Sequence, residues 1–329
     1  MAYDGRIMQR ALTRFDEDKQ RRAAQLEQRR RTAYARAPRL AEIEAELRGT
    51  MGRIISSALA RGTDPVPAIR VLRDENLQLQ RERAELLASL GYPADYLEEK
   101  PACDKCGDTG YVSGGVCACL RAYYAREQLA ELSRLLPLGE DSFETFSFDW
   151  YDSAVQPAFG ISPRENMERN YDVCRDYAYQ FAKGSGDLLL SGGTGLGKTF
   201  LSACIARVVS ENGFSVVYDT AASVFSRFED AKFRRDDGGS EDADRCMRCD
   251  LLILDDLGTE MTTSFVQSAL YQIVNGRLMA GRSTIISTNL APEEIGSRYG
   301  RSVLSRLEGE YEILPFFGED IRRLKRERQ

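Results

Sequence analysis

The sequence predicts an α/β protein, a parallel sheet flanked by helices, preceded by a helical hairpin and a small cysteine-rich module. The sheet is predicted because short apolar segments alternate with helix-like segments from about residue 160 onward, and a glycine-rich loop joins the first pair. The hairpin is predicted because residues 1 to about 95 are rich in Arg, Glu, Leu, Gln and Ala, which favour helix. The third observation is a group of four cysteines between these two parts.

Charge and composition narrow the possible functions. The formal net charge of −6 argues against a strongly basic nucleic-acid coat, although an excess of arginine in the first forty residues leaves local basic faces possible. No apolar run approaches the roughly 20 residues of a bilayer span, and the start does not resemble a signal peptide, so we expect a cytoplasmic protein. The sequence has no histidine, which excludes every mechanism that needs imidazole.

The helical hairpin depends on an apolar stripe with one interruption. Apolar residues recur at three- and four-residue spacing, the segment RGTDPVP interrupts them, and GYP ends the pattern. Two interpretations stay open: the helices bury their own stripe, or the stripe docks a partner protein. The stripe consists of Leu40, Ile43, Leu47, Met51, Ile54 and Leu59, followed by Ile69, Leu72, Leu79, Leu86 and Leu90.

The cysteine cluster CDKCGDTGYVSGGVCAC occupies residues 103–119. Thiols stay reduced in a cytosol, so closely spaced cysteines favour a metal over a disulfide. We interpret the cluster as a closed structural Zn²⁺ site, with redox chemistry and ligand-free cysteines as alternatives. The glycines within it permit a tight knuckle. The expected ligands are Cys103, Cys106, Cys117 and Cys119. A second pair, CMRC at 246–249, lacks partner ligands, and we interpret it as buried or incidental cysteines.

Four strands and two helices are expected in the carboxy-terminal half. The strand segments are 187–191, 214–220, 251–256 and 284–289, and the helical segments are 198–213 and 264–281. Strands that alternate with helices in this way form a parallel sheet covered by helices. The polar segment RRDDGGSEDADR at 234–245 is predicted to be a mobile loop.

The segment GGTGLGKT at 192–199 fits the phosphate-binding pattern G-x-x-x-x-G-K-[ST] and lies between a predicted strand and a predicted helix. Its backbone N–H groups are expected to bind phosphate oxygens. Lys198 would supply a positive charge to the β- and γ-phosphates, and Thr199 a hydroxyl ligand to Mg²⁺. A merely glycine-rich turn is the alternative. The expected ATP-binding residues are Gly192, Gly193, Thr194, Gly195, Leu196, Gly197, Lys198, Thr199 and Phe200.

A second motif, LLILDD at 251–256, supports the phosphate site. A buried strand of this kind delivers its last residues to the carboxyl edge of the sheet, where open α/β folds bind ligands. Asp255 is then the Mg²⁺-associated carboxylate, and Asp256 is the base that orients the attacking water. Asn289, at the end of the next strand segment, could hold the water or the γ-phosphate. The alternative is a pair of solvated acids at a strand end.

Aromatic and basic residues alternate in AASVFSRFEDAKFRR at 221–235. Aromatic faces and cations together suit sequence-tolerant binding of single-stranded nucleic acid. The alternative is an amphipathic helix whose phenylalanines belong to the core. The expected DNA-binding residues are Phe228, Lys232, Phe233, Arg234 and Arg235.

The chain as a whole resembles AAA+ ATPases, and more narrowly the bacterial and phage replicative helicase loaders of the DnaC/DnaI type. The resemblance rests on LGYPADYLEE, the cysteine cluster with GDTGYV, FETFSFDWY at 143–151, GGTGLGKT, LLILDDLG and STN. It implies a P-loop NTPase fold and a Mg²⁺-dependent ATPase that binds single-stranded DNA and oligomerises. It also implies an amino-terminal module that grips a DnaB-type replicative helicase.

The resemblance assigns further residues. Arg306, in YGRSVLSRLEG, matches the arginine finger that reaches the ATP of a neighbouring subunit, and Arg322 or Arg323, in GEDIRR, matches the sensor-2 arginine. The carboxy-terminal lid of other AAA+ proteins should be nearly absent, because only about fifteen residues follow the last strand.

The sequence also leaves two other functions open and predicts a division into four segments. The rivals are the ATPase helper of a transposase, which usually lacks the cysteine module, and a nucleotide-gated adaptor with little turnover. The expected segments are a helicase-binding helical domain at 1–99, a zinc knuckle at 100–121, a linker at 122–160 and the AAA+ ATPase domain at 161–329.

Overall fold

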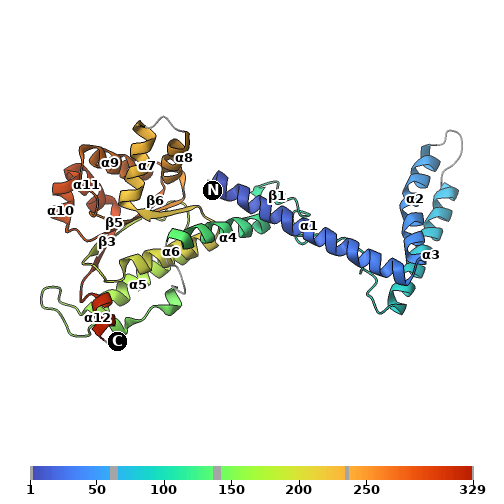
Figure 1. Ribbon diagram of the computed structural model, residues 1–329, viewed down its shortest axis with the longest axis horizontal. Coiled ribbons are helices and arrows are strands. Elements are labelled where there is room, and N and C mark those ends of the chain that lie inside the picture. Colours follow the sequence, from blue (N-terminus) through green and yellow to red (C-terminus); the bar gives the residue numbers. More distant parts are fainter. Residues whose placement is uncertain (1–2, 60–65, 136–141, 234–236, 328–329) are drawn as a thin grey trace. The chain divides into compact units, whose positions relative to one another are not determined.

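The structure is a computed structural model that describes residues 3–59, 66–135, 142–233 and 237–327 (Figure 1). The chain divides into two compact units, one of residues 13–117 and one of residues 118–329 together with the first twelve. The sequence placed those twelve residues in the helical domain. They belong instead to the sheet-containing unit, where Arg245 pairs with Asp4 at 2.7 Å. Among the described residues, every helix is too short or too polar to cross a bilayer.

The unit of residues 13–117 contains most of α1 (Gly5–Arg36), with α2 (Arg39–Leu59) and α3 (Val66–Ser89). Helix α2 packs along α3, as the predicted hairpin requires (Figure 1). Leu40 of α2 and Leu87 of α3 are fully buried in one small cluster with Ala33 and Leu97. Leu86 and Leu90 of the predicted stripe pack against this cluster, so the hairpin buries at least this part of its own apolar stripe. The side chains of Met51, Ile54, Leu59 and Ile69 lie outside the described residues.

The other unit is built on a five-stranded sheet. Its strands are β3 (Asp187–Gly192), β4 (Val216–Thr220), β5 (Leu251–Leu257), β6 (Ser283–Thr288) and β7 (Tyr311–Phe316). All neighbours are parallel, in the order β4-β5-β6-β3-β7. The four predicted strands and the parallel sheet are confirmed. We did not name β7 from the sequence, and it contains Pro315, which a strand tolerates at the edge of a sheet.

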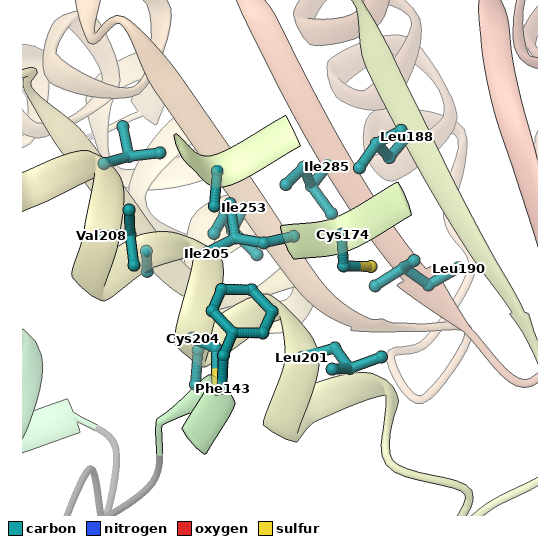
Figure 2. Packing of buried hydrophobic residues seen from close by; sticks show 14 of the residues in the cluster. Phe143, Cys174, Leu188, Leu190, Leu201, Cys204, Ile205, Val208, Ile253 and Ile285 are labelled. Carbon is teal, nitrogen blue, oxygen red and sulfur yellow. The ribbon is translucent and has the colours of Figure 1, made fainter. Parts of the chain in front are cut away.

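Helices cover both faces of this sheet. Figure 2 shows one face, where Cys174 of α5 (Pro163–Tyr179) and Leu201, Cys204 and Ile205 of α6 (Lys198–Glu211) pack over the strands. The other face carries a second buried cluster. That cluster is supplied mainly by α7 (Ala221–Phe233), α8 (Asp237–Arg248), α9 (Ser264–Met279), α10 (Pro292–Tyr299) and α11 (Arg301–Glu310).

Further helices precede and follow the sheet strands in the sequence. Helix α4 (Ala118–Leu135) precedes an aromatic segment with the short helices η1 (Phe143–Thr145) and η2 (Phe148–Trp150). Helix α12 (Ile321–Glu327) follows β7. At the free edge of β7, the side-chain amides of Asn166 and Asn170 both donate to the carbonyl oxygen of Pro315, each at 2.7 Å.

The loop predicted at 234–245 is wrong for residues 237–245, which belong to helix α8. The segment is polar overall, but Ala243 and Cys246 bury one face of it in the core. Arg245 adds a second ion pair, with Glu131 at 2.7 Å. Tertiary contacts therefore hold a helix that the composition alone does not favour. Cys246 and Cys249 are buried in the same cluster, as the sequence predicted for this pair.

Candidate functional site

The glycine-rich loop joins β3 to α6 at the carboxyl edge of the sheet. The Lys198 ammonium donates to the carbonyl oxygens of Gly192 and Gly193 at 2.7 and 2.6 Å, and to Asn289 Oδ1 at 2.8 Å. Burial lowers the pKa of Lys198 to about 8, although Asp256 and Asp255 act in the opposite direction. The ammonium is thus a buried donor held at the mouth of the loop, which is where a phosphate needs a cation.

Close contacts explain why the loop needs glycine at two positions. Gly195 and Gly197 both have left-handed backbones, with φ of 70° and 95°. A Cβ on Gly195 would lie 1.9 Å from a carboxylate oxygen of Asp320, and one on Gly197 would lie 2.7 Å from the Tyr151 hydroxyl. The start of α12 is tied to the same loop, because the Ile321 N–H donates to the Gly195 carbonyl at 3.0 Å.

A cavity of about 530 Å³ opens beside the loop, which is within the usual size of small-ligand sites. Residues 194–200 line it continuously, and Asp256 and Asn289 face it from the neighbouring strand ends. Three aromatic residues, Phe146, Trp150 and Phe200, also line the cavity, and the ring centres of Phe146 and Phe200 are 5.4 Å apart. Sequence reasoning used this aromatic segment only as a family marker and missed it as part of the site. A cavity with cationic and apolar ends suits a nucleotide.

Asp255 and Asp256 lie near the end of β5, where its register with β6 shifts between Leu254 and Leu257. Asp255 is only 4% exposed, and its carboxylate accepts from Thr199 Oγ1 at 3.4 Å. Hydroxyl and carboxylate oxygens are ligands that Mg²⁺ prefers, so Thr199 and Asp255 fit a magnesium site.

Asp256 has a different environment from its neighbour. Its backbone is left-handed, with φ of 54°, and its N–H donates to Ser287 Oγ at 3.0 Å. This backbone is unusual for a residue other than glycine, and such residues concentrate at functional sites. Burial raises the pKa of Asp256, and the Asp255 charge adds to this, whereas Lys198 and Arg322 lower it. The conformation turns Asp256 toward the cavity, where a carboxylate can accept a proton.

Comparison with known proteins relates the sheet-containing part of the chain to an ATP-binding family. The family described as IstB-like ATP binding protein matches residues 173–329, the stretch that contains all five strands of the parallel sheet. Residues 173–329, slightly less than half of the chain, have the fold of an AAA+ ATP-binding domain. This confirms the fold class that the sequence predicted, a parallel sheet flanked by helices with a P-loop.

Two curated relatives resemble parts of the chain. The uncharacterized protein YdaV of Escherichia coli (strain K12) is 31% identical over 161 residues, which are 45% of this chain and 64% of YdaV. The replicative helicase loader DnaC of the same strain is 30% identical over 135 residues, which are 40% of this chain and 54% of DnaC. The matches thus span between about half and two thirds of these relatives. A crystal structure of the DnaC helicase loader superposes with a TM-score of 0.46 at 20% identity, over 55% of this chain and 99% of that one.

The three arginines assigned from the resemblance lie in different surroundings. Arg322 of the AAA+ domain lines the cavity beside Lys325, whereas Arg323 pairs with Glu327 at 3.0 Å and does not line it. Of the two sensor-2 candidates, Arg322 is therefore the one near the nucleotide site. Arg306 lies half-buried on α11, and within the described part of the chain it makes no hydrogen bond or ion pair.

The structure changes the DNA-binding prediction. Phe228 is 8% exposed and packs in the core of the AAA+ domain with Val224 and Phe225, so its prediction as a base-stacking residue is wrong. Lys232 is exposed on α7. Phe233 ends that helix and its side chain is not described, while Arg234 and Arg235 lie outside the described residues.

The four clustered cysteines come together in space. Their sulfur atoms all lie within 4.8 Å of one another, and those of Cys103 and Cys117 are 3.8 Å apart. A tetrahedral zinc site with Zn–S bonds of about 2.3 Å has sulfur–sulfur edges of about 3.8 Å. None of the four is in a disulfide. The cysteines therefore fit one Zn²⁺, and a two-stranded hairpin, β1 (Tyr111–Val112) and β2 (Gly115–Val116), lies between the two pairs.

Asp108 supports the cysteine cluster from within, and sequence reasoning missed it. Its carboxylate accepts the backbone N–H groups of Ala102 and Cys103, each at 3.0 Å, and a hydrogen bond from Arg22 at 2.8 Å. Its backbone is left-handed, with φ of 57°. The first cysteine loop is thereby anchored to helix α1. The only sequence signal was its place in the GDTG segment, which did not indicate these partners.

Proposed function

We propose that this protein is an ATP-driven loader of a replicative DNA helicase of the DnaB type, acting on single-stranded DNA in the cytoplasm and hydrolysing ATP at a subunit interface. The observation that carries the proposal is that Lys198, Thr199, Asp256 and Asn289 line one cavity, while the buried Asp255 accepts a hydrogen bond from Thr199. The similarity to curated proteins named replicative helicase loader supports the choice of process.

The chemistry follows from the positions of these side chains. Lys198 exchanges its carbonyl acceptors for phosphate oxygens. Thr199 and Asp255 would hold Mg²⁺, which neutralises charge on the β- and γ-phosphates. Asp256, whose pKa is raised, accepts the proton of the attacking water, and Asn289 orients the water or the γ-phosphate. Arg306 serves the ATP of the neighbouring subunit, and Arg322 contacts nucleotide in its own cavity.

Asp256→Asn should bind ATP normally and fail to hydrolyse it. The amide keeps the size of the side chain but cannot take up the proton, whereas Lys198, Thr199 and Asp255 are unchanged. We expect turnover to fall by about 10²- to 10⁴-fold, measured by phosphate release, with the ATP affinity measured by equilibrium fluorescence titration. Glu260→Gln, at an acid just beyond the same strand, is the control. Wild-type turnover in Asp256→Asn would show that the base is a different residue.

Lys232→Ala should reduce the salt dependence of single-stranded DNA binding. Loss of one phosphate contact lowers the slope of log K against log salt concentration by about one. Lys183→Ala, at an exposed lysine just before β3, is the matched control and should keep the wild-type slope. Phe228→Ala should instead destabilise the fold by about 3 to 5 kcal/mol, because it removes a core side chain. An unchanged slope in Lys232→Ala would remove α7 from the DNA site.

Affinity capture tests the proposed partner. The tagged full-length chain, incubated with lysate of its native cells and ATP, should retain a DnaB-type helicase. Recovery of a transposase would favour the second candidate, an ATPase helper of a transposase. If this chain retains the helicase and binds ATP but does not hydrolyse it, the result would favour the third candidate, a nucleotide-gated adaptor.

A further inference from the structure

A buried hydrogen-bond ring lies behind the nucleotide site and joins Thr199 and Asp255 of the sequence motifs to Tyr218 and Ser202, which belong to neither motif. Tyr218, in the middle of β4, donates to Asp255 Oδ2 at 2.8 Å, and its hydroxyl also lies 3.1 Å from Ser202 Oγ. Ser202 Oγ also lies 3.1 Å from the carbonyl oxygen of Thr199, and its single proton serves either this oxygen or the Tyr218 hydroxyl. Because Thr199 bonds to Asp255, these contacts form a closed ring.

The ring is shielded from water. Tyr218 is 3% exposed and Ser202 is fully buried, and neither lines the nucleotide cavity. A tyrosine hydroxyl at this depth needs a polar partner, and Asp255 and Ser202 supply it. A buried carboxylate also needs donors, because an unsatisfied one is costly. The burial therefore fixes the two partners to each other.

Ser287 of β6 holds the same carboxylate from the opposite side. Its hydroxyl donates to Asp255 Oδ1 and accepts the Asp256 N–H at 3.0 Å. Strands β4 and β6 are the two neighbours of β5 in the sheet. The Asp255 carboxylate is therefore gripped at both oxygens by hydroxyl groups from both adjacent strands, which leaves its plane little freedom to rotate.

We propose that Tyr218 and Ser287 are positioning residues that set how tightly this protein holds the divalent cation of its nucleotide site. The proposal rests on the proposed function, in which Asp255 and Thr199 hold Mg²⁺. Hydrogen-bond partners of a metal-binding carboxylate fix its orientation, and their loss typically costs about 10- to 100-fold in metal affinity or activity. Of the two acids, Tyr218 bonds only to Asp255, whereas Ser287 also accepts the N–H of Asp256.

The test uses the full-length chain and separates the metal from the nucleotide. Tyr218→Phe should bind ATP in EDTA with wild-type affinity, because Lys198 and the glycine-rich loop are untouched. It should need about 10- to 100-fold more Mg²⁺ for half-maximal turnover. The affinity of the protein–ADP complex for Mn²⁺, measured by electron paramagnetic resonance, should fall by the same factor.

Tyr177→Phe is the matched control. Its hydroxyl donates to the Gly186 carbonyl at 3.0 Å, and its ring packs against the same core on α5. Removing this hydroxyl should leave both metal readouts at their wild-type values. Ser287→Ala should weaken Mn²⁺ binding as Tyr218→Phe does, and should lower maximal turnover as well.

Wild-type Mg²⁺ dependence and Mn²⁺ affinity in a folded Tyr218→Phe protein would overturn the proposal. If Tyr218→Phe does not fold, Ser287→Ala decides in its place, and normal Mn²⁺ binding there overturns it equally. Absence of Mg²⁺-stimulated turnover in the wild type would instead defeat the proposed function, and the Mn²⁺–ADP measurement would still test Tyr218.

Discussion

A mixture of Arg306→Ala and Lys198→Ala proteins should regain ATPase activity that neither variant has alone. Lys198→Ala leaves a cavity without its buried ammonium, so we expect it to lose ATP binding, while its Arg306 stays intact. Arg306→Ala keeps every contact of Lys198 and should bind ATP normally. In other phosphoryl-transfer systems an arginine of this kind is worth about 10³- to 10⁵-fold in turnover. Interfaces that pair an Arg306→Ala cavity with a Lys198→Ala subunit are complete.

The measurement is phosphate release by the mixture at concentrations where the wild type assembles on single-stranded DNA or on the helicase. Arg301→Ala, at an exposed arginine that begins the same helix, is the control and should keep wild-type turnover. Within the described residues Arg306 has no ion pair, so its loss leaves no partner unpaired there. If the variants co-assemble and the mixture stays inactive, Arg306 does not act on a neighbouring subunit.

Cys106→Ser should abolish zinc binding and unfold the cysteine cluster. Structural zinc sites contribute apparent folding free energies of about 10 to 16 kcal/mol at neutral pH, far more than the other contacts of so small a loop supply. We expect about one Zn²⁺ per wild-type chain and none in the variant. Nucleotide binding should survive, because the residues that line the ATP cavity lie between 145 and 325. Helicase binding should be lost if the cluster supports the amino-terminal helices.

Elemental analysis and nucleotide titration measure these two outcomes. Cys174→Ala, at a buried cysteine of α5 outside the cluster, is the control and should retain zinc. The hydrogen bonds of Asp108 tie the first cysteine loop to Arg22, so hydrogen exchange should rise at both places in Cys106→Ser. Wild-type protein that contains no zinc when purified without chelators would refute the metal site.

Short sequence patterns predicted those parts of the site whose structure depends mainly on residues close together in the sequence. The glycine-rich loop, Asp255, Asp256 and four strands follow from spacing and burial pattern, and the structure brings the loop and the acids together. Helix α8 and the core position of Phe228 depend on contacts far away in sequence, which composition does not report. The same holds for Tyr218 and Asp108, whose partners come from other strands or from helix α1. The sequence implied a last strand about fifteen residues before its end but not the bounds of that strand, and the structure identifies it as β7.

The free edge of β7 also limits how copies of the domain can join. Pro315 has no N–H to offer, and its carbonyl oxygen already accepts from both Asn166 and Asn170. A strand from another molecule would therefore lack pairing groups at this point, as is typical of edges that natural proteins protect from sheet extension. Growth of one continuous sheet across subunits is therefore disfavoured at this point of β7, and self-association through this edge would have to use side chains.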